Sequence, residues 1–113
     1  MSRRADKRIF LNPPVAAVIN TGDRQIDAII TDICSSGLGF QTKEQLKKGS
    51  IVIFELNNDE NVDLPDKIKT KIKNEYENTE NHYVYGAKIP RISHWYERNR
   101  IHNFVYAELK KQE

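Results

Sequence analysis

Six short segments with apolar or alternating side chains, separated by polar turns, follow one another through most of the chain. β-Branched and aromatic residues are frequent in these segments, and glycine, asparagine and aspartate are frequent between them, which is typical of short strands. The segment at 51–56 is apolar at nearly every position and predicts a central strand. We expect strands at Val15–Ile19, Gln25–Asp32, Leu38–Thr42, Ile51–Leu56, Ile68–Lys73 and His82–Ile89.

After the last of these segments the apolar period changes from two to about four. Ile101, Val105 and Leu109 recur on one face, which predicts an amphipathic helix. Ser93 is suited to cap its first turn, so we expect the helix to begin at about residue 93. Six short strands followed by one helix favour a barrel or a sandwich, with the helix on one opening or flank.

Length and composition limit the chain to one small domain of 113 residues. We expect a flexible basic arm over 1–12 and a single domain over 13–113. One cysteine excludes an intramolecular disulfide, so we expect a cytoplasmic protein. The sequence shows neither a secretory signal nor an apolar run long enough to predict a membrane span.

The segment 68–73 places three lysines on one face and isoleucine and threonine on the other. Such lysines suit an exposed sheet face or an edge strand protected against pairing. The alternative is a small nucleic-acid-binding barrel that uses this lysine face and stacks bases on Tyr83 or Tyr85. A formal net charge of +2 and acidic loops on both sides argue against it, so we expect no nucleic acid polymer as a partner.

The residues that usually carry catalysis are scattered along the chain. His82, His94 and His102 belong to no metal-binding or HExxH pattern, and Cys34 has no histidine close by in the sequence. A phosphate-binding loop of the Gly-x-x-x-x-Gly-Lys kind is also missing from the sequence. We therefore expect no enzyme, no metal and no cofactor.

Two polar stretches remain as candidate chemistry. The first is the cluster of Arg3, Arg4, Lys7 and Arg8; the second begins at Asp32, which we place in a tight turn rich in small residues. Guanidinium groups bind phosphate oxygens and stack on purine rings. A carboxylate accepts both hydrogen bonds from the pairing edge of guanine. Together the two stretches suit a guanine nucleotide with more than one phosphate charge.

The motifs in these two stretches resemble those of the PilZ domain, a family of bacterial receptors for the second messenger cyclic di-GMP. Arg4-Ala5-Asp6-Lys7-Arg8 matches an RxxxR motif, and Asp32-Ile33-Cys34-Ser35-Ser36-Gly37 closely follows a DxSxxG motif. The strand at 51–56, the strand ending in Gly86-Ala87-Lys88-Ile89 and the terminal helix also fall where PilZ domains place theirs. The resemblance implies a mainly β fold, a six-stranded antiparallel β-barrel with a C-terminal α-helix.

The resemblance also implies a non-catalytic receptor and its binding residues. Arg4 and Arg8 would be the main ligand contacts, with Arg3 as a candidate third. Asp32 would take a guanine edge, and Gly37 would shape the turn. Binding would order the basic arm, and the reshaped surface would be read by a downstream effector protein.

The chain departs from the motif at Cys34, which replaces the serine that contacts the ligand in the family. A thiol is a weaker hydrogen-bonding group than a hydroxyl, and one lost neutral hydrogen bond costs about 0.5–1.5 kcal/mol, roughly two- to tenfold in affinity. We expect weakened binding, or substitution by Ser35 if the turn is shifted by one residue. The alternative is a PilZ-like adaptor that binds a protein and not the nucleotide.

Overall fold

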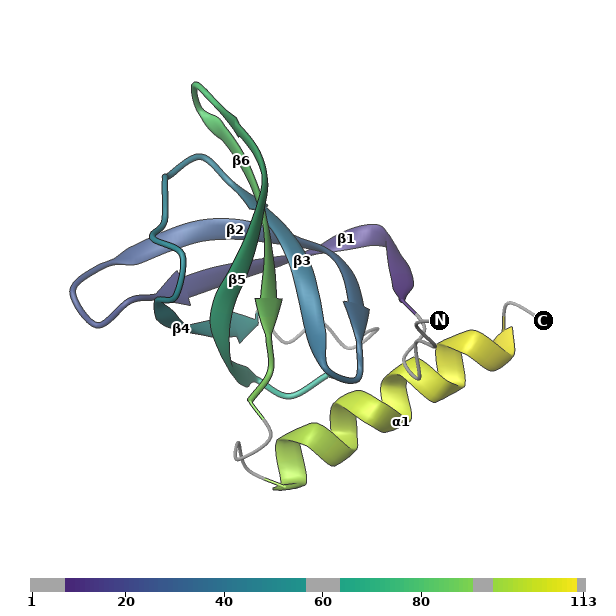
Figure 1. Ribbon diagram of the computed structural model, residues 1–113. Coiled ribbons are helices and arrows are strands. Elements are labelled where there is room, and N and C mark those ends of the chain that lie inside the picture. The colour runs from purple at the N-terminus through teal and green to yellow at the C-terminus, as the bar shows by residue number, and fades with distance from the viewer. Residues whose placement is uncertain (1–7, 57–63, 91–94, 112–113) are drawn as a thin grey trace, which may run out of the picture.

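Six antiparallel strands close on themselves, and a helix follows them (Figure 1). The computed structural model describes residues 8–56, 64–90 and 95–111. The strand order around the barrel is β1-β2-β3-β6-β5-β4, and β4 pairs with β1 to close it. This confirms the mainly β fold and decides for the barrel over the sandwich. The elements are β1 Ile9–Asn20, β2 Gln25–Cys34, β3 Gly37–Thr42, β4 Ile51–Leu56, β5 Lys67–Thr79, β6 His82–Lys88 and α1 Trp95–Lys111.

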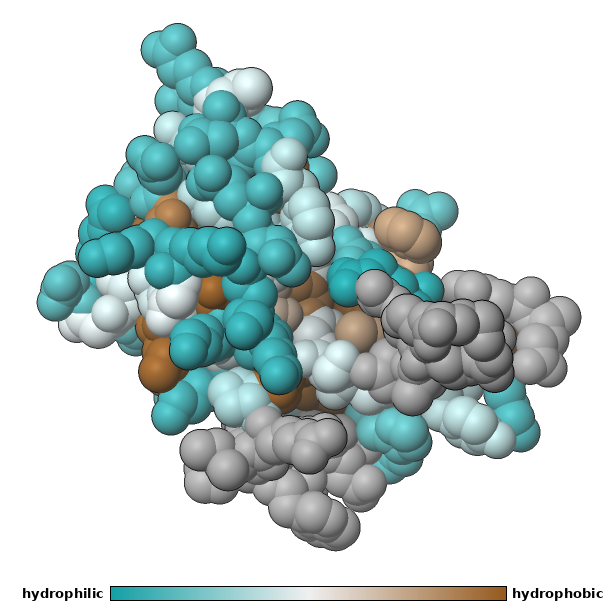
Figure 2. Space-filling view, viewed as in Figure 1, coloured by the Kyte–Doolittle hydropathy of each residue, from teal (hydrophilic) through white to brown (hydrophobic). Residues whose placement is uncertain are grey.

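The prediction of a central strand at 51–56 was wrong. Val52 and Phe54 are buried, but Ile51 and Ile53 are 58% and 36% exposed. A closed barrel has no central strand, and every second side chain of each strand points outward. Figure 2 accordingly shows hydrophobic atoms at the surface among hydrophilic side chains where β4 and β5 lie.

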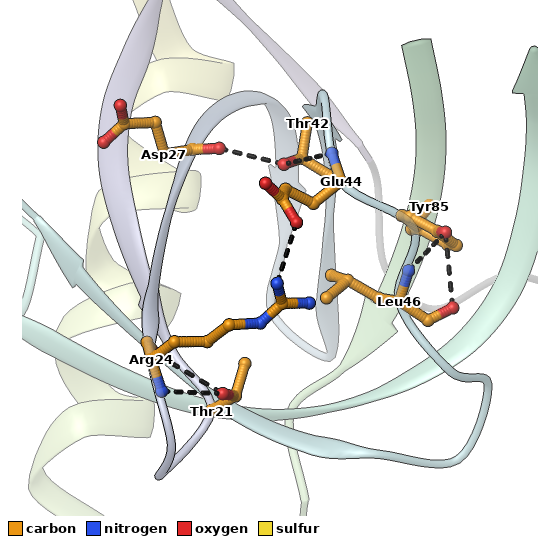
Figure 3. A network of polar contacts seen from close by, with 7 residues as sticks. All are labelled: Thr21, Arg24, Asp27, Thr42, Glu44, Leu46 and Tyr85. Atoms are coloured by element: carbon orange, nitrogen blue, oxygen red, sulfur yellow. Dashed lines mark hydrogen bonds and ion pairs between the residues drawn. The ribbon is translucent and has the colours of Figure 1, made fainter. Parts of the chain in front are cut away.

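The barrel interior is filled by inward-pointing aliphatic and aromatic side chains. Phe40 packs edge-on against Phe54 with ring centroids 4.9 Å apart, and Tyr85 lies 5.5 Å from Phe40. The Tyr85 hydroxyl accepts a hydrogen bond from the Leu46 amide at 2.8 Å and donates to the Leu46 carbonyl at 3.3 Å (Figure 3). This buried hydroxyl is thereby satisfied, and it holds the loop after β3 against β6. Tyr85 is 1% exposed, so it offers no surface for stacking a base.

The helix α1 lies beside one end of the barrel (Figure 1) and contacts β1 and β2. Ile101 and Val105 are buried in the same core as the strands, and Leu109 is partly buried against it. The four-residue period of the sequence therefore marks the face that packs on the barrel. Ser93, the predicted cap, lies outside the described residues.

Four strands, β1, β2, β3 and β5, are longer than predicted because pairing continues past the apolar residues. β1 begins at Ile9, inside the segment expected to be the arm, since Ile9 pairs with Ile33. Its register shifts between Phe10 and Val15, where two prolines lack the N–H needed for a regular ladder. β5 continues past the predicted end at Lys73 to Thr79, and the chain reverses at Asn81, whose φ of 66° suits asparagine.

Candidate functional site

The two predicted halves of the site meet on the outer face of the barrel. The Arg8 guanidinium, just before β1, forms an ion pair and hydrogen bond from Nη1 to Oδ2 of Asp32, 24 residues away. The contact follows from strand register, because β1 and β2 are antiparallel and Ile9 lies opposite Ile33. A basic segment entering β1 is thus brought to the carboxylate on β2.

Asp32 lies within β2 and not in a turn as expected, since the turn consists of Ser35 and Ser36 alone. The β2–β3 register is irregular between Ile30 and Asp32. A bulge of this kind redirects a side chain and increases local twist. Ile30 faces the core, whereas Asp32 lies opposite Gly39, and its carboxylate packs over that glycine on the outer face.

The Asp32 carboxylate already has two protein partners. Besides Arg8, the Thr31 hydroxyl donates a hydrogen bond to Oδ1 at 2.7 Å. Asp32 is only 9% exposed, while the Arg8 side chain is 33% exposed. The carboxylate is therefore covered by the residue that is expected to contact the ligand with it.

The Arg8 guanidinium remains charged. Partial burial lowers the pKa of Arg8, but the hydrogen bond and the negative charge of Asp32 raise it more in sum, so the net pKa lies above its usual value. The phenol of Tyr76 and the thiol of Cys34 act on Arg8 in the same direction. The site therefore presents a permanent cation at Arg8.

Two glycines form a flat strip next to Asp32. Gly39 lies opposite Asp32 on one side and Gly86 on the other. A Cβ at Gly39 would lie 2.4 Å from Oδ1 of Asp32, so only glycine leaves room for the carboxylate. At Gly86 a Cβ would approach the ring of Tyr76 at 3.0 Å. Asp32 on β2, Gly39 on β3, Gly86 on β6 and the ring of Tyr76 from β5 thus lie in a row across the outer face.

Tyr76 was missed because it lies between the strands predicted at 68–73 and 82–89. It lies in β5, where the register with β6 shifts between Glu75 and Glu77, and it is 62% exposed. Its hydroxyl accepts a hydrogen bond from Asn74 Nδ2 at 3.3 Å. Glycines inside a strand often mark close approach by another group. Gly86 was therefore the signal in the sequence that could have pointed to this position.

The motif glycine is required for a reason other than the expected turn conformation. Positive φ angles at described glycines occur at Gly22 and Gly49, not at Gly37. A Cβ at Gly37 would instead lie 2.5 Å from the carbonyl oxygen of Ala87 on β6. Gly37 therefore allows β3 and β6 to approach each other beside the site.

Cys34 lies opposite Gly37 and is 3% exposed. Its sulfur is 3.6 Å from the Ser36 hydroxyl, within range of a weak hydrogen bond. Ser35 is half-buried in the turn. Arg3 and Arg4, the other predicted contacts, lie outside the described residues.

Other kinds of site find little support in the described part of the chain. Between residues 8 and 111, with the gaps given above, no three histidine, cysteine or acidic side chains gather to hold a metal ion. A cavity of about 810 Å³ exists elsewhere, and neither Arg8 nor Asp32 lines it. No helix in the described ranges has the length and apolarity to cross a bilayer.

Comparison with known proteins identifies the family. The sequence model of the PilZ domain matches residues 2–107. Among solved structures, the PilZ domain of Escherichia coli YcgR with c-di-GMP is similar with a TM-score of 0.75, at 14% identity, covering 98% of this chain and 95% of that one. The Bacillus subtilis inhibitor of motility MotI/DgrA has a TM-score of 0.73 at 10% identity, and the K. pneumonia MrkH–c-di-GMP complex has 0.71 at 18% identity.

This chain matches only part of the MotI/DgrA and MrkH chains. All of this chain is matched, but it spans only 54% of the MotI/DgrA chain and 57% of the MrkH chain. No curated protein sequence gave a significant match. At identities of 10–18%, the solved structures show only a shared fold. The match of the family model shows the family, because it covers residues 2–107. The chain therefore belongs to the PilZ domain family, whose members generally bind cyclic di-GMP and do not catalyse a reaction.

Proposed function

We propose that this chain binds cyclic di-GMP on the outer face of β2, β3 and β6 and passes the signal to a partner protein. The observation that carries the proposal is the contact between Arg8 and Asp32, which brings the two motifs together across 24 residues of sequence. Both side chains lie beside Gly39 and Gly86, where the absence of a Cβ lets the Asp32 carboxylate and the Tyr76 ring lie close over the strand backbone.

In this proposal Arg8, with Arg3 and Arg4, contacts phosphate and guanine, and Asp32 accepts hydrogen bonds from a guanine edge. The Arg8 guanidinium is paired with the Asp32 carboxylate. The ligand phosphate must therefore bind the guanidinium and release it from Asp32 before the carboxylate can accept hydrogen bonds from a base. Because Asp32 is only 9% exposed, the ligand must itself pair with the carboxylate to offset the loss of the Arg8 contact. The charge-assisted bonds formed with phosphate are stronger than neutral ones.

Tyr76 extends the proposed site on its far side. An exposed aromatic ring is suited to stack on a base, and such stacking contributes about 1–3 kcal/mol per base. The ring of Tyr76 lies over Gly86, two strands away from Asp32. In this arrangement Asp32 would bind the edge of one base of the dinucleotide, and Tyr76 would stack on the other base.

We infer that binding orders the basic residues before β1. Arg8 lies immediately before Ile9, so a ligand that holds Arg8 also fixes the direction in which the chain enters β1. Ser35, Gly37 and Cys34 lie at the end of β2 and the start of β3, next to the same surface. A partner protein would then read the ordered segment together with the bound ligand.

Titration calorimetry with cyclic di-GMP tests the proposal. We expect Arg8→Ala and Asp32→Ala each to weaken binding at least tenfold, since each removes charge-assisted bonds of about 1.5–3 kcal/mol. Arg24→Ala is the matched control, because Arg24 forms a similar ion pair with Glu44 at 3.0 Å in a different part of the barrel (Figure 3). Cyclic di-AMP, which lacks the two adjacent guanine donors, should bind more weakly. Absence of heat from the unaltered chain at about 100 μM ligand would sink the proposal.

The second candidate is a PilZ-like adaptor that binds a protein without the nucleotide. Two observations favour it: Asp32 is already paired with Arg8 and Thr31, and the motif serine is a buried cysteine. A partner captured equally by the unaltered chain and Arg8→Ala, with or without cyclic di-GMP, would support the adaptor over the receptor.

A further inference from the structure

The outer face of β4, β5 and β6 carries a group of lysines next to two exposed isoleucines. Directly opposed residues place them on one face: Ile51 opposes Lys71, Ile53 opposes Lys69, and Lys71 also opposes Lys88. Lys73 is exposed on the same strand. We call this surface the basic face and define it as Ile51, Ile53, Lys69, Lys71, Lys73 and Lys88.

A neighbouring turn adds further positive charge. The Gly49 amide donates to the Ile72 carbonyl at 2.8 Å, and the Ile72 amide donates to the Ser50 carbonyl at 2.9 Å. These bonds hold Lys47 and Lys48, both exposed, beside the same strand.

Of the two structural explanations for these lysines, the exposed sheet face is confirmed and the protected edge is wrong. β5 pairs with β4 on one side and with β6 on the other, so it has no free edge. The arrangement also opposes stability, because Lys71 and Lys88 are like charges directly across from each other. Among the described residues, the ion pairs involve none of the six residues of the basic face.

The combination of charge and apolar surface narrows the choice of partner. Nucleic acid would use the lysines but would leave Ile51 and Ile53 unburied. A protruding protein segment would need a hollow, and the described cavity is lined by none of the basic face. An anionic bilayer needs no hollow, since lysine side chains extend to the headgroups while apolar side chains enter the boundary with the acyl chains.

We propose that the basic face binds the surface of an anionic lipid bilayer. Exposed lysines at alternate positions of a strand lie about 6.8 Å apart, well within one Debye length at physiological salt, so they act together on a charged surface. Clusters of four to eight basic residues are sufficient for such attraction. This attachment is separate from the proposed nucleotide binding and does not depend on it.

Flotation of the full chain with large unilamellar vesicles tests the proposal. Vesicles of phosphatidylcholine with about 30% phosphatidylglycerol should bind the protein at about 50 mM salt, and pure phosphatidylcholine vesicles should not. The triple substitution Lys69→Gln/Lys71→Gln/Lys73→Gln should weaken partitioning about 100-fold. Ile51→Thr/Ile53→Thr, which keeps β-branched side chains, should weaken it about tenfold. Circular dichroism confirms that each variant is folded.

A matched control removes equal charge elsewhere. Lys43→Gln/Lys110→Gln/Lys111→Gln should bind within about threefold of the unaltered chain. All variants keep the basic residues at 3–8, so that cluster cannot produce a difference between them. No flotation with the anionic vesicles, equal loss in the control triple variant, or unchanged binding of the isoleucine variant would each overturn the proposal. So would lysine-dependent binding to a single-stranded oligonucleotide without vesicle binding, which would assign the face to nucleic acid.

Discussion

At the scale of single residues, the outer face beside Asp32 leaves no room for side chains at two positions. Gly37 faces the Ala87 carbonyl oxygen, a backbone atom, and Gly39 faces the carboxylate of Asp32. Gly86 differs, because the group above it is the ring of an exposed tyrosine. The same substitution should therefore have different consequences at these glycines.

Gly39→Ala should lower the free energy of unfolding by about 1–3 kcal/mol and abolish the contact of Arg8 with Asp32, because the new methyl displaces the carboxylate. Gly86→Ala should change stability by less than about 1 kcal/mol, since the Tyr76 ring can move and alanine reduces the entropy of the unfolded chain. Urea denaturation measures both variants. If both variants lost the same free energy of unfolding, contact with the Asp32 carboxylate would not be the reason for glycine at residue 39.

Cys34 is the residue at which the chain departs from its family. Cys34→Ser should tighten binding of cyclic di-GMP about two- to tenfold, because a hydroxyl forms a stronger hydrogen bond than a thiol. Cys34→Ala, the control, should bind no more tightly than the unaltered chain. Calorimetry that finds the serine and alanine variants alike would show that this position does not bond to the ligand.

At the scale of elements, the irregular register of β5 against β6 determines which side chains reach the site. Register shifts between Ile72 and Asn74 and again between Glu75 and Glu77 change which side chains face outward. As a result Tyr76 lies over Gly86, in the same row as Asp32. A regular strand would repeat with a period of two, and β5 does so only as far as Ile72.

Tyr76→Ala should weaken binding of cyclic di-GMP by about 1–3 kcal/mol, or roughly 5- to 150-fold, through loss of base stacking. Tyr76→Phe should retain most of the affinity, because stacking needs the ring and not the hydroxyl. Tyr106→Ala, which removes an equally exposed ring from α1, serves as the control. Similar affinities for Tyr76→Ala and the control would contradict the proposed stacking.

At the scale of the whole molecule, the closed barrel depends on contacts between residues far apart in sequence. Tyr85 joins β6 to the backbone of Leu46, 39 residues earlier, and packs on Phe40 from β3. Burial raises the pKa of Tyr85 above 10, and the nearby charge of Glu75 raises it further, outweighing the hydrogen bond with the Leu46 backbone. The fold therefore requires the neutral phenol.

Alkaline pH should reveal this requirement. Above about pH 10 an unfolded tyrosine loses its proton while folded Tyr85 keeps it, so the unfolded state binds fewer protons and the free energy of unfolding falls as pH rises. Tyr85→Phe should reduce this fall between about pH 9 and 11, although it costs about 1–3 kcal/mol at pH 7 by leaving the Leu46 amide without its partner. Urea denaturation across this range, with Tyr106→Phe as control, measures the difference. An unchanged pH slope in Tyr85→Phe would contradict the assignment.

Much of the fold follows from local pattern. Turn residues and alternating segments predicted six strands in the correct order, and the recurrence of Ile101, Val105 and Leu109 predicted the helix face. Strand ends were predicted less well because pairing partners decide them: β2 extends to Cys34 opposite Gly37, and β1 begins where Ile9 meets Ile33. Pairing partners lie far along the chain, so local propensity does not record them.

The sequence by itself determined the family motifs, the order of the elements and the candidate residues for binding phosphate and guanine, because these depend on residue types and local spacing. Only the tertiary structure placed Arg8 on Asp32 and brought Tyr76 to the same surface. It also showed that the lysines of β5 lie on an exposed sheet face and not on a free edge. The physical reason is that barrel closure and strand register fix which distant side chains become neighbours. A shift of one residue in a single strand would send each of them to the other face.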